Sequence, residues 1–283
     1  MATASTPMGI GARLREWRAR RGLSQLELAL DAGISARHLS FVETGRSKPG
    51  RDLLLRITEQ LGLPFRESNE LLLAAGHAPA FPEHGLHDPE LAPVREALEL
   101  IISGHEPYPA VVVDRGWNVV AASSAVETLA QWVDSDLRQP PLNAMRVGLH
   151  PRGVARWVIN LGDVHAYFAG RLRRQVVLTG DARLAALLEE VEGYPAPEPE
   201  HDPITEAAAG MILTPLMRFR NPVGGGELSF FATVATFGTA AEVTTSELSI
   251  ELAFPADSAT AAALKNIARS VSRTRPETQR RPA

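Results

Sequence analysis

The sequence predicts two domains of different class: an all-α domain of five short helices, followed by an α+β domain with a mostly antiparallel sheet that carries helices on one face. Three observations support this division. The chain has 283 residues, a length typical of two domains. Apolar residues recur at helical spacing as far as residue 75, whereas runs of strand composition dominate after residue 211. The balance of charge also changes between the two parts.

Residues 1–62 carry ten Arg or Lys and six Asp or Glu, a net charge of +4, whereas the rest of the chain carries 19 and 27, a net charge of −8. A basic segment attracts polyanions such as nucleic acids, and an acidic segment does not. Charge sets non-specific attraction and not fold, so it indicates a nucleic-acid-binding domain only together with a motif.

Composition excludes several classes of protein. Apolar residues make up 45% of the chain, which is ordinary for a folded core. The absence of cysteine excludes disulfides and thiolate metal sites. The sequence has no run of about 18 apolar residues, so no membrane helix is expected. Residues 1–8 lack the features of a signal peptide. We therefore expect a cytoplasmic protein with no membrane partner.

Five short helices are predicted in the first domain, residues 1–76, from apolar spacing and from the residues at helix ends. Ser24 and Ser35 have hydroxyls that cap a helix N-terminus, and Glu27 completes a capping box with Ser24. Gly33 can adopt the positive φ of a tight turn between two helices. The predicted helices are 10–20, a second helix that begins after Ser24, and 36–43, 52–61 and 63–75. The predicted buried positions of the second helix are Leu26, Ala29 and Leu30.

The turn between the second and third helices belongs to a recognisable pattern. The matching segments are 14–18, 22–25, Ala29, 33–35, 39–46 and Pro49. With these residues the first domain resembles the Xre/Cro family of repressor-like helix-turn-helix domains. The resemblance implies that helix 36–43 enters the major groove of double-stranded DNA and that the protein is a sequence-specific transcriptional regulator.

The same resemblance implies a set of DNA contacts. Arg37 is the strongest single candidate for a base contact, because a guanidinium can bridge O6 and N7 of guanine. Gln25 is expected to bond a phosphate and to brace the recognition helix, and Glu43 to pair with Arg18. The residues expected to contact DNA are Ser24, Gln25, Ser35, Ala36, Arg37, His38, Ser40, Phe41, Thr44, Arg46 and Lys48.

Three of these residues have alternative interpretations. Arg37 and His38 also fit ordinary solvated surface positions. Phe41 is either a packing residue or an exposed aromatic side chain that touches thymine methyl groups.

The rest of the chain is predicted as a linker, 77–92, an α+β domain, 93–272, and a disordered basic tail, 273–283. Linker histidines at 77, 84 and 87 lack metal-ligand spacing, so we expect no metal. Strands 110–113 and 117–121 form a hairpin around the turn 114–116. The other predicted elements are helices 91–103, 124–132, 153–174, 181–191 and 259–270, a surface loop 194–200, and strands 212–220, 227–236 and 248–254.

The second domain also matches a known pattern, in the segments 39–46, 71–76, 105–110, 114–122, 227–231, 236–239 and 254–257. With these segments the chain resembles MmyB-like transcription regulators, whose ligand-binding domain has a PAS-like fold. The resemblance implies a buried pocket for a small apolar ligand, of which a fatty acid is one class. Ser123 stands where the family often has Asn, so ligand preference is expected to differ if that Asn shapes the pocket.

Aromatic and polar residues of the second domain supply candidates for this pocket. Each aromatic residue has ordinary core packing as its alternative. Further aromatic candidates are Tyr167, Phe219, Phe230 and Phe237. The predicted ligand-binding residues are Trp117, Trp132, Asn143, Arg146, His150, Trp157, Phe168 and Phe231, with Asn143, Arg146 and His150 at the polar end.

The sequence contains no GxSxG, Walker A, HExxH or CxxC motif, so we predict no catalytic site. The glycines at 224–226 connect two strands, which favours a hairpin turn over a phosphate cradle. The leading hypothesis is a homodimeric, ligand-controlled regulator on a pseudo-palindromic operator. The alternatives are a ligand-independent DNA-binding protein whose second domain serves only dimerisation or partner binding, and an enzyme with an attached DNA-binding domain.

Overall fold

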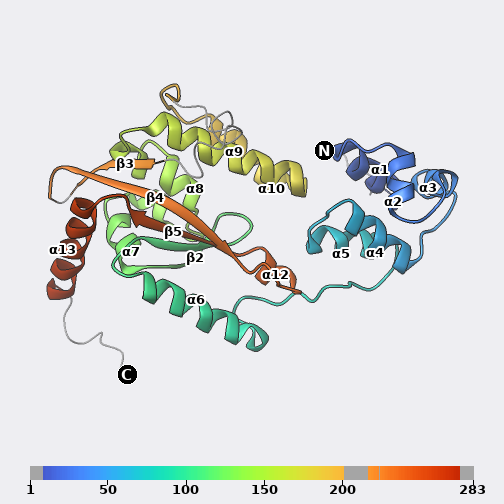
Figure 1. Cartoon of the computed structure of the whole chain (residues 1–283), viewed down its shortest axis with the longest axis horizontal. Coiled ribbons are helices and arrows are strands. Elements are labelled where there is room, and N and C mark those ends of the chain that lie inside the picture. The colour runs from blue at the N-terminus through green and yellow to red at the C-terminus, as the bar shows by residue number, and fades with distance from the viewer. Residues whose placement is uncertain (1–8, 201–215, 223, 275–283) are drawn as a thin grey trace. The chain divides into compact units, whose positions relative to one another are not determined.

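The computed structural model describes residues 9–200, 216–222 and 224–274, which form two compact units (Figure 1). The first unit consists chiefly of the residues up to His84, and the second of most residues from Gly85 onward. Among the described residues, no helix combines the length and the apolar character needed to cross a membrane.

The first unit contains the five predicted helices in the predicted order. Ser24 accepts a hydrogen bond from the Glu27 amide at 3.2 Å and Glu27 accepts one from the Ser24 amide at 2.7 Å, so the predicted capping box is confirmed. Ser35 caps the third helix, and Gly33 has a φ of 69° in the turn. The helices are α1 (Ile10–Arg20), α2 (Gln25–Asp31), α3 (Ala36–Glu43), α4 (Arg51–Gln60) and α5 (Phe65–Ala74).

The buried face of α2 contains Ala29 as predicted, but its buried leucine is not one of the two predicted. Leu26 and Leu30 are 59% and 68% exposed, whereas Leu28 and Ala29 are fully buried. The helix has leucines on two faces, and apolar spacing alone does not distinguish them. The face that includes the small Ala29 turns inward, because only small residues permit the close crossing with α3.

Gly11 provides a second close approach, between α1 and α3. A Cβ atom at this position would lie 2.4 Å from the carbonyl oxygen of Val42 and 2.5 Å from that of Glu43. Both distances are far shorter than a van der Waals contact, so α1 packs on the end of α3 only without a side chain here.

The second unit is built on one five-stranded sheet of order β2-β1-β5-β4-β3, in which all neighbours are antiparallel. The late strand β5 therefore lies between two hairpins, β1–β2 and β3–β4. The predicted antiparallel sheet is confirmed. The strands are β1 (Ala110–Val113), β2 (Val119–Ala122), β3 (Leu216–Arg220), β4 (Glu227–Thr236) and β5 (Ser249–Pro255).

Helices cover both faces of the sheet, so the expectation of helices on one face was wrong (Figure 1). Leu98 and Ile102 of α6 pack with Val112 and Ile250 on one face, and α8, α9 and α10 pack on the other. The reason is visible in β1, Ala-Val-Val-Val, which has apolar side chains on both sides, as strands buried on both faces do. The helices are α6 (Ala92–His105), α7 (Ser124–Ala130), α8 (Ala144–Leu149), α9 (Leu161–Thr179), α10 (Ala182–Glu192), α12 (Val243–Ser246) and α13 (Ser258–Thr274).

Several predicted boundaries change. The strand predicted from Trp117 begins at Val119, because Trp117 has a φ of 65° and belongs to the turn. The predicted helix 153–174 divides into a 3-10 turn, Val154–Trp157, and the later α9. Helix α8 was missed, and α13 includes the first two residues of the predicted tail. Residues 212–215 of the predicted third strand and residues 275–283 of the tail lie outside the described residues.

Gly11→Ala tests the close approach of α1 to α3. In an open helical position, Gly→Ala stabilises a helix by up to about 1 kcal/mol. At Gly11 the new Cβ forces the helices apart, so we expect a loss of about 1–3 kcal/mol in the free energy of unfolding, measured by urea denaturation. Gly104→Ala in α6 is the matched control, because no described atom lies within 4 Å of its added Cβ. Equal effects of the two substitutions would contradict the steric argument.

Candidate nucleic-acid interface and ligand cavity

The outer face of α3 presents polar and aromatic side chains together. Leu39 and Val42 are fully buried and hold the helix against its neighbours. The predicted DNA-contacting residues all retain exposed surface. Those that are exposed are Ser24, Ser35, Arg37, Thr44, Arg46 and Lys48, and those partly exposed are Gln25, Ala36, His38, Ser40 and Phe41.

Phe41 lies at the centre of this face, between two cations. The Arg37 Cζ atom lies 5.4 Å from the centroid of the Phe41 ring, and the Arg46 Cζ atom lies 5.9 Å from it. Both distances are within the range of a cation–π interaction. The arrangement places two guanidinium groups, one on α3 and one after its end, against the same partly exposed ring.

The orientation of α3 depends on a buried carboxylate at its last residue, Glu43. Arg18 of α1 donates to both oxygens of Glu43, from Nε at 2.6 Å and from Nη2 at 3.0 Å. Gln25 Nε2 donates to the same carboxylate at 2.7 Å. The predicted pair of Arg18 with Glu43 is confirmed, and Gln25 supplies the bracing contact. Its bond to a phosphate stays a prediction.

These contacts shift the pKa of Glu43. Burial by itself raises the pKa of the carboxyl group, but the hydrogen bonds from Arg18 and Gln25 outweigh burial and hold the pKa below its ordinary value. The hydrogen bond to Glu43 raises the pKa of Arg18 in turn. Both groups are therefore charged at neutral pH and join three helices.

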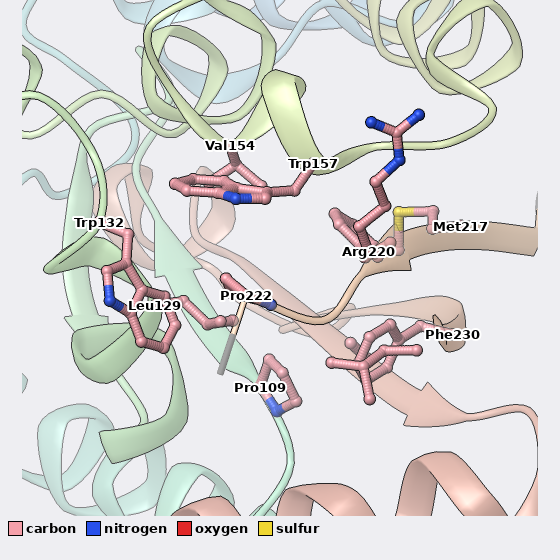
Figure 2. A pocket seen from close by; sticks show the side chains of 12 residues that line it. Pro109, Leu129, Trp132, Val154, Trp157, Met217, Arg220, Pro222 and Phe230 are labelled. Carbon is pink, nitrogen blue, oxygen red and sulfur yellow. The ribbon is translucent and has the colours of Figure 1, made fainter. Parts of the chain in front are cut away.

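The second unit contains a partly open cavity of about 130 Å³ on the face of the sheet that α9 covers. Figure 2 shows the indoles of Trp132 and Trp157 on one side of it and Met217 and Phe230 on the other. Its wall is almost entirely apolar. Of the described residues that line it, Arg220 alone is charged. The lining residues are Pro109, Leu129, Trp132, Val154, Trp157, Met217, Phe219, Arg220, Pro222, Leu228, Phe230 and Ala253.

The two tryptophans are fixed by contacts at the rim of the cavity. Arg156 stacks over the ring of Trp157 at 4.1 Å and donates a hydrogen bond to the carbonyl oxygen of Trp132. Asp134 pairs with Arg156 at 3.6 Å. Two residues after Trp157, the Ile159 amide donates to the Arg218 carbonyl of β3 at 2.7 Å. The 3-10 turn is thus attached both to the end of α7 and to the edge of the sheet.

Of the eight predicted ligand-binding residues, Trp132 and Trp157 line the cavity. The aromatic residues Trp117, Phe168 and Phe231 lie elsewhere. The Trp117 Nε1 donates to Gln175 at 2.8 Å, and its ring packs against Phe168. Phe231 is 41% exposed and stacks on Phe254.

The predicted polar end of the pocket is also engaged elsewhere. Asn143 caps the N-terminus of α8, and Arg146 pairs with Glu190 at 2.8 Å. The His150 ring packs edge-on against Tyr194. The structure therefore brings none of these three side chains to the cavity wall.

Ser123, the departure from the family pattern, has a structural contact. Its hydroxyl oxygen accepts a hydrogen bond from the Ala110 amide at 3.0 Å, and its own amide donates to the Ala110 carbonyl at 2.9 Å. It therefore anchors the start of β1 and does not line the cavity.

Trp132, Trp157, Phe219 and Phe230 were named as candidates from the sequence and line the cavity, whereas the other lining residues were missed, although one signal was present. Met217 and Phe219 alternate in β3, as Leu228 and Phe230 do in β4, and Met217 pairs with Phe230 across the two strands. Alternate residues share a face of a sheet. The pattern thus places these four side chains together, whereas Pro109, Leu129 and Val154 reach the site only through the tertiary fold.

No metal centre is found within the described parts of the chain, where no three His, Asp or Glu side chains lie close enough to hold an ion.

Two family models match the chain. Residues 14–68 match the model described as helix-turn-helix. Residues 94–267 match the model described as MmyB-like transcription regulator ligand binding domain, which is more than half of the 283 residues.

The chain is also similar to individual proteins. It is 35% identical over 103 residues to RghRB of Bacillus subtilis (strain 168), an uncharacterized HTH-type transcriptional regulator; the match covers 36% of this chain and 66% of that protein, slightly less than two thirds of its length. It is 33% identical to the clp gene regulator ClgR from C. glutamicum, covering 24% of this chain and 83% of that one with a TM-score of 0.21. An RNA-binding light-oxygen-voltage receptor is 14% identical, covering 93% and 64% with a TM-score of 0.28. Because both TM-scores are low, the fold assignment depends on the family models and the sheet topology.

Glu43→Gln tests the buried carboxylate. Removing its charge leaves Arg18 without a buried counter-ion, so we expect a loss of about 2–3 kcal/mol in the free energy of unfolding at pH 7. The folded-state pKa is lowered, so this stabilisation is complete above the unfolded-state pKa of about 4.3 and is lost as the pH falls through the folded-state value. The difference in the free energy of unfolding between wild type and variant should therefore become smaller below about pH 4. Urea denaturation at a series of pH values measures this difference.

Glu16→Gln is the matched control, since Glu16 forms an exposed ion pair with Arg20 on the same unit. It should cost less than about 1 kcal/mol. A Glu43→Gln effect that is independent of pH would contradict the assigned role of the carboxylate.

Proposed function

Because the chain belongs to the MmyB-like transcription regulator ligand binding domain family and has a helix-turn-helix domain ahead of that domain, we propose that it binds a specific DNA operator as a homodimer under the control of a small apolar ligand. The observation that carries the DNA-binding part is the exposed outer face of α3, held in place by Arg18, Gln25 and Glu43. The observation that carries the ligand part is the apolar cavity of the second unit.

Contacts of two kinds are proposed at the DNA. Arg37 donates to a guanine in the major groove, where a guanidinium distinguishes this base from the other three. Arg46 and Lys48 follow α3 and contact phosphates, which positions the helix without selecting a sequence. The net charge of +4 over residues 1–62 supports this polyanion-binding role.

The homodimer follows from the small number of bases that one helix contacts. Two copies of α3 related by a twofold axis would occupy half-sites about one helical turn apart, which doubles the recognised sequence and makes the operator pseudo-palindromic. We propose that the second unit holds the two copies together, because it is the larger of the two.

Arg37→Ala is expected to weaken binding to the operator by about 1–3 kcal/mol and to reduce binding to random DNA much less. Arg183→Ala, which removes the same charge from an exposed side chain of the second unit, is the control and should leave both affinities unchanged. Fluorescence anisotropy at fixed salt measures both affinities, and the stoichiometry should be two chains for each operator. Equal losses on operator and random DNA would show that Arg37 contacts only the backbone.

The volume of the cavity limits the ligand. An apolar cavity of about 150 Å³ in another protein stays dry and binds benzene. A cavity of about 130 Å³ therefore accommodates an apolar group of that size. A fatty acid, one class that we propose, would place the end of its chain there and extend beyond the mouth or widen the cavity. Arg220 replaces Arg146 as the proposed partner of a negatively charged head group.

Control by a ligand requires that it bind the DNA-competent and DNA-incompetent forms with different affinity, since equal affinity shifts no equilibrium. The attachment of the Trp157 turn to both α7 and the edge of β3 supports such a difference. Filling the cavity would press on both attachments and so on the outer edge of the sheet.

Leu129→Trp is designed to fill the cavity. Leu129 lines the cavity, so the larger side chain should displace any small molecule that is retained on purification. Leu100→Trp introduces the same side chain at a position 72% exposed on α6 and should retain the molecule. Native mass spectrometry of the full chain, followed by extraction, measures the bound mass. A dimer that never carries a molecule, even after incubation with fatty acids, would favour a second unit that serves only dimerisation.

A further inference from the structure

Phe41 occupies a position in α3 that packing does not explain. The buried residues of the first unit form one core around Leu14, Leu39 and Ile57, and partly buried apolar side chains such as Trp17 pack against that core. Phe41 is not among them, although it is the largest apolar side chain of α3. Its described ring contacts are instead the two guanidinium groups of Arg37 and Arg46.

We propose that Phe41 and Arg37 act together as one reading unit, which selects a guanine with a thymine on the adjacent base pair. This inference depends on the DNA-binding function proposed above and names the sequence that the same site selects. In the major groove, guanine presents two acceptors to a guanidinium, and thymine presents a methyl group that apolar side chains contact.

The distance between the two side chains sets the spacing of the two bases. Base pairs in DNA are separated by about 3.4 Å along the axis, so positions two steps apart are separated by about 6.8 Å. The Arg37 Cζ atom and the Phe41 ring centroid are 5.4 Å apart, so their separation along the DNA axis is at most 5.4 Å, less than two steps, which favours neighbouring base pairs. A guanine–cytosine pair carries no methyl group, so the thymine lies on the neighbouring pair.

The stacking also prepares Arg37 for the base. A free arginine side chain loses rotamer entropy when it forms a fixed pair of hydrogen bonds. Contact with the ring of Phe41, one helical turn later, restricts the guanidinium before DNA arrives. Phe41 therefore contributes to guanine selection as a positioning residue as well as through its own contact with the thymine methyl group.

The first experiment is selection of binding sites by the full chain from a random duplex library. Enrichment of a motif with guanine beside a thymine in each half-site is expected. An enriched motif without such a step would overturn this inference and leave DNA binding intact. Failure to enrich any motif would instead contradict the proposed function itself, so the two failures are distinguishable.

The second experiment replaces that thymine by uracil, which removes one methyl group and leaves base pairing unchanged. Loss of the buried methyl contact should weaken binding of the wild-type chain about fourfold. In Phe41→Ala the thymine and uracil duplexes should bind equally, whereas Lys48→Ala should weaken both and preserve the fourfold ratio. If Phe41→Ala still binds the thymine duplex about fourfold more tightly than the uracil duplex, the proposal is overturned.

Discussion

The first unit depends on a carboxylate in an unfavourable position. Glu43 is the last residue of α3, where the carbonyl end of the helix dipole repels negative charge, and its side chain is buried. Two hydrogen bonds from Arg18 and one from Gln25 offset both costs. Because these donors lie on α1 and α2, the direction of the recognition helix is determined by the two helices that precede it. The exposed face of α3 is thus positioned by contacts on its buried side.

Local signals in the sequence were sufficient to predict the helices of the first unit and their order. The capping box of Ser24 and Glu27 and the left-handed Gly33 depend on neighbours in the chain, and each appears as expected. On the inward face of α2 Ala29 was predicted correctly and the leucines were not, because Leu26 and Leu28 are equally apolar and only the packing partner distinguishes them. Local chemistry predicted the elements, while the choice of face required knowledge of the neighbouring helix.

The cavity was harder to predict because its wall is assembled from distant segments. Pro109 precedes β1, Leu129 belongs to α7, and Met217 and Phe230 meet only through the register of β3 with β4. Trp117 illustrates the opposite error: its aromatic character suggested a ligand contact, but its left-handed backbone turns it into the core. Residue type alone therefore did not separate lining residues from core residues, and strand pairing identifies only the part of the wall that β3 and β4 form.

The position of β5 has a consequence for how the protein is made. Residues 249–255 form the middle strand of the sheet, so the two hairpins have no direct connection within the sheet until these residues have left the ribosome. The five helices of the first unit lie within residues 10–74, so the contacts between them can form before residue 249 is synthesised. During every round of synthesis there is accordingly an interval in which a complete helix-turn-helix unit is attached to an incomplete sheet. A ribosome that stops before residue 249 would prolong that state, and such chains would carry the helix-turn-helix unit without the middle strand of the second unit's sheet.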